Sequence, residues 1–480
     1  MNRRDFLTSS AALATAPLLD SFTYAAAPGA NERIRVAVMG VRGRGRAHVS
    51  ALLAQPNVEI AYLCDVDKEA IGPTLARIEK ASGKTPIVVQ DVRKILEDRS
   101  VDALTIATPN HWHVLAALWA CQAGKDVYVE KPISQSIVEG RRLTEAARKY
   151  GRMVQHGTQN RSNESIREAV DFMRAGKLGK VTLARAVNYK RRQSIGKHKT
   201  ATAVPASVDY DLYVGPSPMT PLERLKLHYD WHWFWNFGSG DMGNQGVHQI
   251  DVALWGLGKK GLPRSVSSAA GRFAYDDDGE TANTQMAVYD YGDCKLVCEV
   301  RNLESPTLLT VRTGNIWYGT EGYIVRDLAT GNTCRAYLGK SKEPVPLGEG
   351  KADLGTLDNA HFANFLAAMR SRKADDLKAD VEIGHYSSSH CHLANISYRL
   401  GKETAFNAPQ GPFADKEAAE TFQRLEQHLR DNKLDLNGIK YRLGRTLTVD
   451  AGNETLGEDK EANALLRRSY RKPFVVPDKV

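Results

Sequence analysis

Residues 33 to 156 alternate between two hydrophobic patterns, and this alternation constrains the fold more than any other feature of the chain. Short apolar runs typical of buried strands are separated by segments with helical spacing of their apolar residues. The strand-like runs are Ile34–Met39, Val58–Cys64, Ile87–Val89, Ala103–Ala107, Asp126–Val129 and Met153–Gln155. The helix-like segments are Ala47–Leu53, Lys68–Lys80, Val92–Leu96, His111–Ala123 and Ile137–Lys149. This order predicts an α/β domain with a doubly wound parallel sheet and right-handed crossovers.

The pattern changes after Gly157, where longer strands with alternating polarity follow one another. They are expected at Val181–Tyr189, Val266–Tyr275, Thr284–Tyr291, Lys295–Arg301 and Leu308–Thr313. Helices are expected at Ser165–Ala175, Ala360–Arg372, Ser387–Leu400, Lys416–Asn432 and Glu461–Arg471. Turn residues between successive strands are typical of antiparallel pairing. We therefore expect a second, α+β domain with a large, open, mainly antiparallel sheet.

A chain of 480 residues is too long for one compact core and predicts two or three domains. We place the first domain at residues 33–156, the second at 157–400, and at 401–480 a C-terminal extension that packs on the second. The net charge of +9 comes mainly from scattered basic residues. No recognition motif accompanies them, so we expect no nucleic-acid partner. No apolar run approaches the ~20 residues that cross a bilayer.

Residues 1–27 have the features of an export signal. The adjacent arginines Arg3-Arg4 precede a mildly apolar stretch, and Ala25-Ala26-Ala27 offers a small-residue cleavage site. We interpret them as a twin-arginine signal; the alternatives are an ordinary secretory peptide and a disordered N-terminus. The twin-arginine export machinery carries folded proteins, so we expect a periplasmic or secreted protein. Six cysteines without framework spacing suit a chain that folds in a reducing compartment before export.

A glycine-rich turn follows the first predicted strand and opens a helix. Gly40, Gly43 and Gly45 let the backbone approach a pyrophosphate, which the N–H groups of the helix N-terminus then bind. Arg42 stands where the usual spacing has a second glycine, and it can add positive charge to phosphate contacts. The turn predicts a dinucleotide site, in which Gly40, Arg42, Gly43 and Gly45 contact the cofactor.

Asp65 ends the second predicted strand, 25 residues after Gly40. A carboxylate at this place accepts hydrogen bonds from both ribose hydroxyls and repels a 2′-phosphate, which favours NAD(H) over NADP(H). The alternative role for Asp65 is to cap the following helix. Because an exported protein leaves the cytoplasmic cofactor pool, we expect NAD(H) to be tightly bound.

Polar residues follow the fourth and fifth predicted strands. Thr108, Asn110 and His113 come after the fourth strand, and Glu130 and Lys131 after the fifth. Ligands of open α/β sheets bind at the carboxyl ends of strands, so we expect all five to contact the cofactor. Taken alone, each segment is more often a turn with a helix cap.

In combination these motifs resemble the glucose–fructose oxidoreductase / inositol dehydrogenase (Gfo/Idh/MocA) family. The resemblance covers about residues 33–400 and rests on the glycine-rich turn, Asp65, Thr108-Pro109-Asn110-x-x-His113, Glu130-Lys131-Pro132 and Gly246-x-His248-x-x-Asp251. It implies an N-terminal Rossmann domain, a C-terminal α/β domain whose open sheet often mediates oligomers, and thus a homo-oligomer, a dimer or tetramer. The tail after about residue 401 is similar to the extension of exported bacterial members.

The resemblance implies that Lys131 contacts the reacting hydroxyl and that His248 exchanges its proton. A cation beside an alcohol stabilises developing alkoxide, and histidine is the commonest acid–base group. Many dehydrogenase members have an aspartate four residues before this histidine, where the chain has Asn244. The amide can orient a substrate hydroxyl, while the charge is either missing or supplied by Asp241. An ordinary histidine at a helix start is the alternative for His248.

Substrate-binding candidates lie in two further segments. Asn160 and Arg161 follow the last strand of the first domain, and Trp233 lies in an aromatic cluster, Tyr229–Phe237. Aromatic rings stack on the apolar faces of sugars, but an aromatic plug that anchors a long loop is an equal alternative. The three histidines His385, His390 and His392 do not share one helix face, so we expect no metal site.

Three functions remain open. The leading hypothesis is an exported oxidoreductase that transfers hydride between a sugar hydroxyl and NAD(H), with Lys131 and His248 as catalytic residues. The second is an NAD-dependent glycoside hydrolase or lyase that oxidises a ring hydroxyl only transiently. The third is a catalytically silent sugar-binding homologue, which the substitutions Arg42 and Asn244 would permit.

Overall fold

The computed structural model describes residues 33–480 except 199, 342, 349–352 and 407–411. The predicted export signal, residues 1–27, lies outside the described residues. Residues 34–480 form one unit that contains two sheets.

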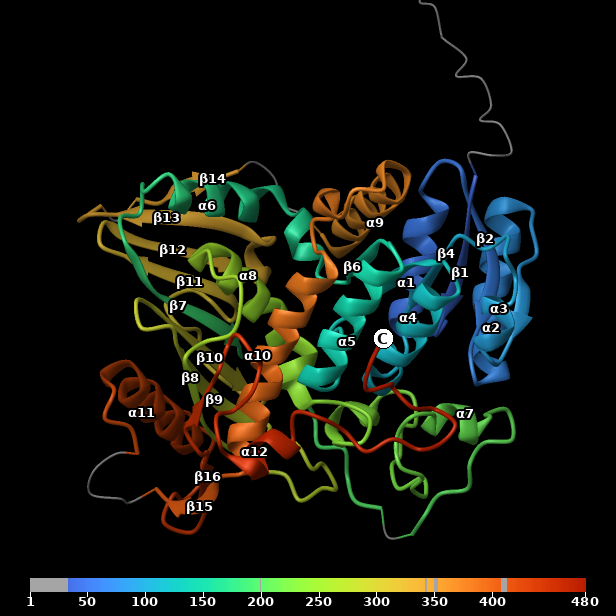
Figure 1. The fold of residues 1–480 in the computed structure, drawn as a ribbon. Helices are drawn as coiled ribbons and strands as arrows, with labels where there is room; N and C mark the ends of the chain where they lie inside the picture. The colour runs from blue at the N-terminus through green and yellow to red at the C-terminus, as the bar shows by residue number, and fades with distance from the viewer. Residues whose placement is uncertain (1–32, 199, 342, 349–352, 407–411) are drawn as a thin grey trace, which may run out of the picture. The chain divides into compact units, whose positions relative to one another are not determined.

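The first sheet has six parallel strands in the order β3-β2-β1-β4-β5-β6 (Figure 1). Its strands are β1 (Ile34–Met39), β2 (Val58–Cys64), β3 (Ile87–Val89), β4 (Ala103–Ile106), β5 (Asp126–Val129) and β6 (Val154–His156). Most of β1, β4 and β5 is buried on both faces, as helices on both sides of a parallel sheet require. The predicted doubly wound α/β fold is confirmed. The strand order reverses between β1 and β4, and such a switch point opens a crevice at the carboxyl ends of the strands.

The helices of this domain are α1 (Gly43–Leu53), α2 (Lys68–Ser82), α3 (Arg93–Leu96), α4 (His113–Gln122) and α5 (Ile137–Lys149). Asp67 caps α2 by accepting from the Glu69 N–H, and Ser136 caps α5 by accepting from the Glu139 N–H. Gly83 ends α2 in a left-handed conformation. Local cap chemistry therefore sets the ends of these helices.

The second sheet has eleven strands, of which β7 and β10 pair in parallel and the other neighbours pair antiparallel. The strands are β7 (Val181–Asn188), β8 (Ser265–Gly271), β9 (Thr284–Asp290), β10 (Lys295–Arg301), β11 (Thr313–Gly319), β12 (Gly322–Asp327), β13 (Thr333–Leu338), β14 (Val345–Leu347), β15 (Lys402–Ala405), β16 (Lys440–Leu443) and β17 (Leu447–Thr448). The mainly antiparallel sheet predicted for this domain is confirmed.

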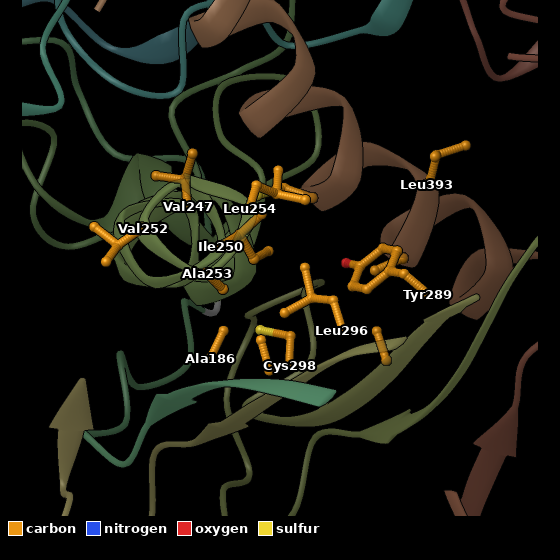
Figure 2. Packing of buried hydrophobic residues seen from close by; sticks show 14 of the residues in the cluster. Ala186, Val247, Ile250, Val252, Ala253, Leu254, Tyr289, Leu296, Cys298 and Leu393 are labelled. Carbon is orange, nitrogen blue, oxygen red and sulfur yellow. The ribbon is translucent and has the colours of Figure 1, made fainter. Parts of the chain in front are cut away.

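Helices cover the second sheet on both faces. The helices after the first domain are α6 (Glu164–Arg174), α7 (Tyr210–Val214), α8 (Val247–Leu257), α9 (Leu354–Ser371), α10 (Val381–Arg399), α11 (Lys416–Asp431) and α12 (Lys460–Ala464). Ala184 and Ala186 of β7 face the cluster that includes α8 and α10, part of which is drawn in Figure 2. Leu183 faces the opposite way, toward Phe422 and Leu425 of α11. This alternation follows the two-residue period of a strand.

Two sequence predictions after the first domain are wrong. The segment Leu308–Thr313 is not a strand: Leu308 and Val311 exchange both backbone hydrogen bonds in a tight turn, and Leu309 between them has a φ of 54°. The strand begins at Thr313, and β12 to β14 follow without having been predicted. The helix expected at Glu461–Arg471 is limited to α12, because arginines beyond it pair with distant acids such as Asp211.

The C-terminal segment 401–480 contacts both domains. Its strands β15, β16 and β17 extend the second sheet beside β8. Its end reaches the first domain, where Phe474 packs edge-on against Trp112 and lies beside Trp119 of α4. Among residues 33–480 with the gaps given above, no helix is long and apolar enough to cross a membrane.

Candidate functional site

A cleft of about 330 Å³ lies at the carboxyl ends of β1, β2, β4 and β5, at the switch point of the first sheet. Nine of the ten predicted cofactor-binding residues line it: Gly40, Arg42, Gly43, Asp65, Thr108, Asn110, His113, Glu130 and Lys131. Gly45 lies behind the lining. The structure therefore brings together residues from four separate segments of the sequence.

The glycine-rich turn packs so closely that side chains do not fit within it. A Cβ on Gly45 would lie 1.8 Å from the Gly40 carbonyl oxygen, and one on Gly40 would lie 2.7 Å from the Ala107 carbonyl oxygen. Gly40 also has a φ of 80°, which favours glycine. Arg42 precedes α1 without making a side-chain cap, so the first N–H groups of the helix remain available to an anion.

Asp65 holds the glycine-rich turn against β2. One carboxylate oxygen accepts from the Val41 N–H at 2.9 Å and the other from the Asp67 N–H at 3.0 Å. Burial raises the pKa of Asp65 against the lowering effect of these hydrogen bonds. The cap of α2 is Asp67, so the alternative role of Asp65 as that cap is wrong.

A long segment that we call the strap, residues 200–238, lies against the cleft. It supplies Tyr213, His228, Tyr229, Trp231 and His232 to the cleft lining. Backbone hydrogen bonds join it to the turn between β2 and α2, from the Lys68 N–H to the Ser207 carbonyl and from the Asp209 N–H to the Val66 carbonyl. No local motif in the sequence marks Tyr213 and His228, whereas Tyr229, Trp231 and His232 belong to the aromatic cluster Tyr229–Phe237.

The strap also binds residues of the cleft through side chains. His228 Nε2 lies 2.9 Å from the Asp67 carboxylate, and the Trp112 indole N–H donates to the Leu212 carbonyl at 2.8 Å. His111 Nε2 lies 2.8 Å from the Tyr213 carbonyl. The strap is thus held to the first domain at both the α2 and the α4 side of the cleft.

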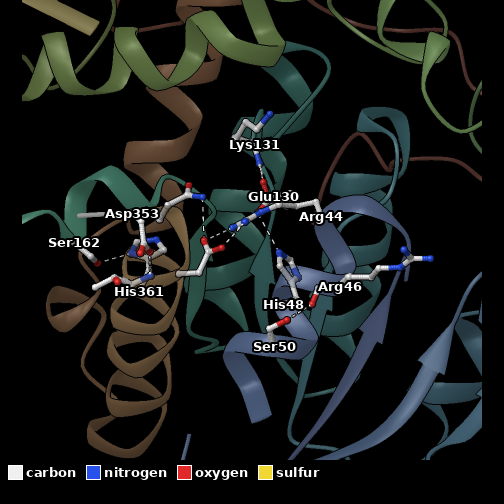
Figure 3. A network of polar contacts seen from close by, with 12 residues as sticks. Arg44, Arg46, His48, Ser50, Glu130, Lys131, Ser162, Asp353 and His361 are labelled. Atoms are coloured by element: carbon white, nitrogen blue, oxygen red, sulfur yellow. Dashed lines mark hydrogen bonds and ion pairs between the residues drawn. The ribbon is translucent and has the colours of Figure 1, made fainter. Parts of the chain in front are cut away.

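Glu130 lies at the centre of a buried polar network, shown in Figure 3. It accepts from Arg44 Nε at 2.6 Å and from His48 Nε2 at 3.0 Å, while Arg44 also forms a bidentate pair with Asp358 of α9. Burial alone raises the pKa of Glu130, but the charge of Arg44 and the His48 hydrogen bond outweigh it and hold the pKa well below its usual range. Glu130 is therefore ionised and paired with Arg44.

Lys131 points its ammonium group toward the second domain. Nζ donates to the backbone carbonyl of Asn244 at 2.8 Å and to its side-chain oxygen at 3.1 Å. Burial lowers the pKa of Lys131 to about 8, against the opposing charge of Glu130. The imidazole of His113 lies 2.9 Å from the Thr108 carbonyl and 2.7 Å from the Pro132 carbonyl, so it joins the two loops that flank the ammonium group.

His248 lies at the second position of α8 and does not line the cleft. Its Nδ1 is buried and has no hydrogen-bond partner among the described residues. Burial, assisted by the charge of Lys131, lowers the pKa of His248 well below its ordinary value. The imidazole is therefore held neutral, with Nδ1 free to accept a hydrogen bond, and the lowered pKa makes it a weak base.

The other predicted substrate residues have protein partners. Asn160 Oδ1 accepts from Arg326 at 3.0 Å, and Arg161 pairs with Asp251 at 2.9 Å. Trp233 is buried beneath the guanidinium of Arg192. None of the three lines the cleft, where Tyr229, Trp231 and His232 are instead the aromatic residues of the cluster.

The histidines of α10 are also held by protein partners. His385 lies 2.8 Å from Glu454, His390 lies 2.6 Å from the Tyr291 hydroxyl, and His392 lies 3.1 Å from the Ser134 carbonyl. Over the part of the chain that the structure describes, no three His, Cys, Asp or Glu side chains gather as metal ligands.

The cleft suits a dinucleotide on two observations besides the glycine turn. The Thr108 hydroxyl lines it and is buried without a hydrogen-bond partner among the described residues. Asp65 and the open N-terminus of α1 lie along the same cleft, which provides an acceptor for ribose hydroxyls and donors for phosphates.

Comparison with known proteins identifies two family models along the chain. Residues 34–158 match an oxidoreductase family with an NAD-binding Rossmann fold, and residues 160–329 match the C-terminal alpha/beta domain of an oxidoreductase family. Both models belong to GFO_IDH_MocA proteins.

Two curated relatives match parts of the chain. A glycosyl hydrolase family 109 protein of Stenotrophomonas maltophilia is 33% identical over 136 residues, 27% of this chain and 29% of the relative. The 1-carboxy-3-chloro-3,4-dihydroxycyclohexa-1,5-diene dehydrogenase of Comamonas testosteroni is 26% identical over 257 residues, 53% of this chain and 55% of the relative. The chain thus spans about half or less of the length of these relatives.

A solved structure shares the fold. A levoglucosan dehydrogenase in complex with NADH and levoglucosan has a TM-score of 0.58 and 16% sequence identity to this chain. The alignment covers 75% of this chain and 96% of that structure.

Proposed function

Because this chain belongs to the GFO_IDH_MocA oxidoreductase family and has its NAD-binding Rossmann domain, we propose that it oxidises a hydroxyl group of a sugar or sugar derivative, or reduces the corresponding carbonyl group. The observation that carries the proposal is the place of Lys131. Its ammonium group lines the dinucleotide cleft and donates to Asn244 of the second domain, at the border of both domains. A substrate hydroxyl bound at that border would lie beside both the Lys131 cation and the cofactor cleft.

NAD, when bound, supplies the hydride acceptor or donor. Lys131 donates a hydrogen bond to the substrate oxygen and stabilises negative charge on it during oxidation. The pKa of Lys131 is about 8, so its amine can also gain or lose a proton near that pH. His248, held neutral by burial, is the group that we propose to exchange the hydroxyl proton.

NAD(H) is the cofactor favoured over NADP(H). The carboxylate of Asp65 lies in the cleft, and a second carboxylate, Asp67, follows within the same turn. Negative charge at this place repels the 2′-phosphate of NADP(H). Arg42 contacts Asp67 at 3.4 Å and so partly offsets that charge at the rim, while Asp65 itself stays within the turn.

Tight retention of NAD(H) is supported by the strap. Its hydrogen bonds to the β2–α2 turn and to Trp112 must break before residues 200–238 can move off the cleft. This retention suits the export proposed from residues 1–27, in which the twin-arginine machinery delivers a folded, cofactor-loaded protein to the periplasm or outside the cell.

Homo-oligomer formation is supported by one face of the second sheet. Tyr318, Tyr323 and Tyr337 form a row across β11, β12 and β13, and all three remain partly exposed. Helix α11 covers the neighbouring part of this face. We propose a dimer or tetramer built on the tyrosine row, because partly exposed aromatic residues are enriched in interfaces.

A second candidate is an NAD-dependent glycoside hydrolase, favoured by the glycosyl hydrolase family 109 relative. Transient oxidation of a ring hydroxyl would acidify the neighbouring C–H and permit elimination of the glycosidic substituent. The intact Glu130-Lys131-Pro132 motif favours the oxidoreductase over this candidate. Net formation of NADH separates the two functions.

The experiment incubates purified protein with NAD⁺ or NADP⁺ and a panel of aldoses, inositols and anhydrosugars while NADH fluorescence is followed. The proposal expects NADH to accumulate with NAD⁺ and at least one of these polyols. Release of nitrophenol from an aryl glycoside without accumulating NADH would instead establish the hydrolase. Absence of both signals in protein that binds NAD⁺ would indicate a silent sugar-binding protein and contradict the proposal.

A further inference from the structure

The carboxylate of Asp241 lies one hydrogen bond behind the Lys131–Asn244 contact. Asn244 Nδ2 donates to Asp241 Oδ1 at 3.1 Å, while its Oδ1 and backbone carbonyl accept from Lys131. The side chain of Asp241 is 0% exposed. Burial of a carboxylate costs free energy unless hydrogen bonds or an opposite charge compensate it. Asp241 therefore requires partners of this kind.

Asp241 is held by donors from three other segments. Arg192 donates through Nη2 at 2.8 Å and through Nε at 3.3 Å, Asn302 donates at 2.7 Å, and Asn188 donates at 3.1 Å. Asn188 ends β7, and Asn302 directly follows β10. The carboxylate is therefore anchored to the second sheet. Although burial raises its pKa, the charge of Arg192 and these hydrogen bonds lower it below the ordinary value.

The backbone between Asp241 and His248 has an unusual geometry. Residues Met242–Gly246 form a π-helical turn immediately before α8. Such turns occur mostly as single insertions and are frequent at functional sites. Here the turn presents both the carbonyl and the side chain of Asn244 to the Lys131 ammonium group.

We propose that Asp241 is a positioning residue that acts through Asn244 to aim the Lys131 ammonium group and to keep it cationic. A carboxylate can only accept hydrogen bonds, so Asp241 fixes the Asn244 amide with Nδ2 toward itself. The amide oxygen is thereby fixed toward Lys131, which it orients as an acceptor. The inference rests on the proposed role of Lys131.

The charges around Lys131 set the direction of the effect. Glu130 and Asp241 raise its pKa, whereas burial, Arg44 and Arg192 lower it. The imidazoles of His113, His232 and His248 also lie within range of its charge, and burial lowers the pKa of each of them. Loss of the Asp241 charge therefore lowers the pKa of Lys131 further, and a larger share of the amine becomes neutral near pH 8.

The test measures Lys131 without turnover. Purified NAD-loaded protein is labelled with trace acetic anhydride over a range of pH, and mass spectrometry of the Lys131 peptide gives the midpoint of amine deprotonation. We expect Asp241→Asn to lower the midpoint by about one pH unit. Asp251→Asn is the matched control, because Asp251 is an equally buried carboxylate that pairs with Arg161 instead, and it should leave the midpoint unchanged.

A second variant tests the inference independently, in case Asp241→Asn does not fold. Asn244→Ala removes the amide that links Asp241 to Lys131 and should also lower the midpoint, with NAD content and circular dichroism reporting the fold. An unchanged midpoint in both folded variants would overturn the inference. Failure of the sugar panel together with a lowered midpoint would instead overturn the proposed function, while the inference that Asp241 acts on Lys131 through Asn244 would still hold.

Discussion

The guanidinium of Arg44 donates to the Glu130 carboxylate at 2.6 Å and thereby joins the glycine-rich turn to the loop that carries Lys131. Arg44 comes from the first turn of α1, whereas Glu130 follows β5. The Asp358 carboxylate of α9 binds the other side of the same guanidinium. One arginine therefore connects the cofactor turn, the lysine loop and a helix of the following domain.

Replacement of Arg44 by alanine should destabilise the protein strongly. The change leaves Glu130 and Asp358 buried without their cation, which typically costs about 3–5 kcal/mol. Urea unfolding followed by tryptophan fluorescence measures the loss. Arg46→Ala is the control, because the exposed Arg46 lies two residues further along α1 and should change stability by less than about 0.5 kcal/mol. Equal losses in both variants would contradict the role given to Arg44.

The strap should slow the release of NADH. Trp112→Phe keeps an aromatic ring but removes the N–H that donates to the Leu212 carbonyl. Loss of one hydrogen bond worth about 1 kcal/mol should accelerate NADH release about fivefold. The release rate is measured by NADH fluorescence after a chase with excess NAD⁺.

Trp119→Phe provides the matched control for that measurement. Trp119 lies in α4, the helix that begins directly after Trp112, and packs beside Phe474 rather than binding the strap. Release that accelerates equally in both variants would trace the effect to helix α4. Release that is unchanged in Trp112→Phe would show that the strap contact does not limit the departure of NADH.

Much of the first domain could be predicted from sequence because its signals are local. The predicted bounds of β1, β2, β3, β5 and α5 coincide with those of the structure. Each of these strands is a short apolar run, and α5 begins at a serine that caps it. The strands β12 to β14 could not be recognised in this way, since their partners across the sheet determine them.

The residues of the candidate site also differ in whether local sequence signals could predict them. Residues at strand ends, such as Asp65 and Lys131, were predictable because topology brings strand ends together. The partners of Asn160, Arg161 and Trp233 were not, because each contact depends on tertiary packing rather than on spacing. Asp241 could be named from the sequence as a possible source of charge, but its link to Lys131 through Asn244 could not, because Asn188 and Asn302 from distant segments hold it in place.

Glu299 should make stability depend on pH in the acid range. It is buried among Arg301, Arg424 and Arg185, whose charges outweigh the effect of burial and lower its pKa to about 2. A depressed pKa in the folded state adds stability above the unfolded pKa of about 4.3, and this stability is lost as the pH falls toward 2. The contribution is on the order of 3 kcal/mol at neutral pH.

The measurement compares the free energy of unfolding of the wild type and Glu299→Gln from about pH 7 down to about pH 3. The deficit of the variant should be largest at neutral pH and shrink below about pH 4.3, where the Glu299 carboxylate becomes protonated in the unfolded chain but not yet in the folded protein. Glu304→Gln removes an exposed glutamate that pairs with Arg312 and should show almost no deficit at either pH. A Glu299→Gln deficit that is constant with pH would exclude a charge effect.

The central claim is that Lys131 acts on the substrate hydroxyl in an NAD-loaded cleft. Lys131→Met keeps the length and much of the apolar volume of the side chain but removes the cation. The most direct measurement mixes wild type and Lys131→Met, each with its NAD content determined, with the sugar that the panel identifies, and follows NADH formation in a single turnover. The account predicts equal NAD content in both proteins and a loss of at least about a thousandfold in the rate for the variant. NADH formation at the wild-type rate in Lys131→Met would contradict it.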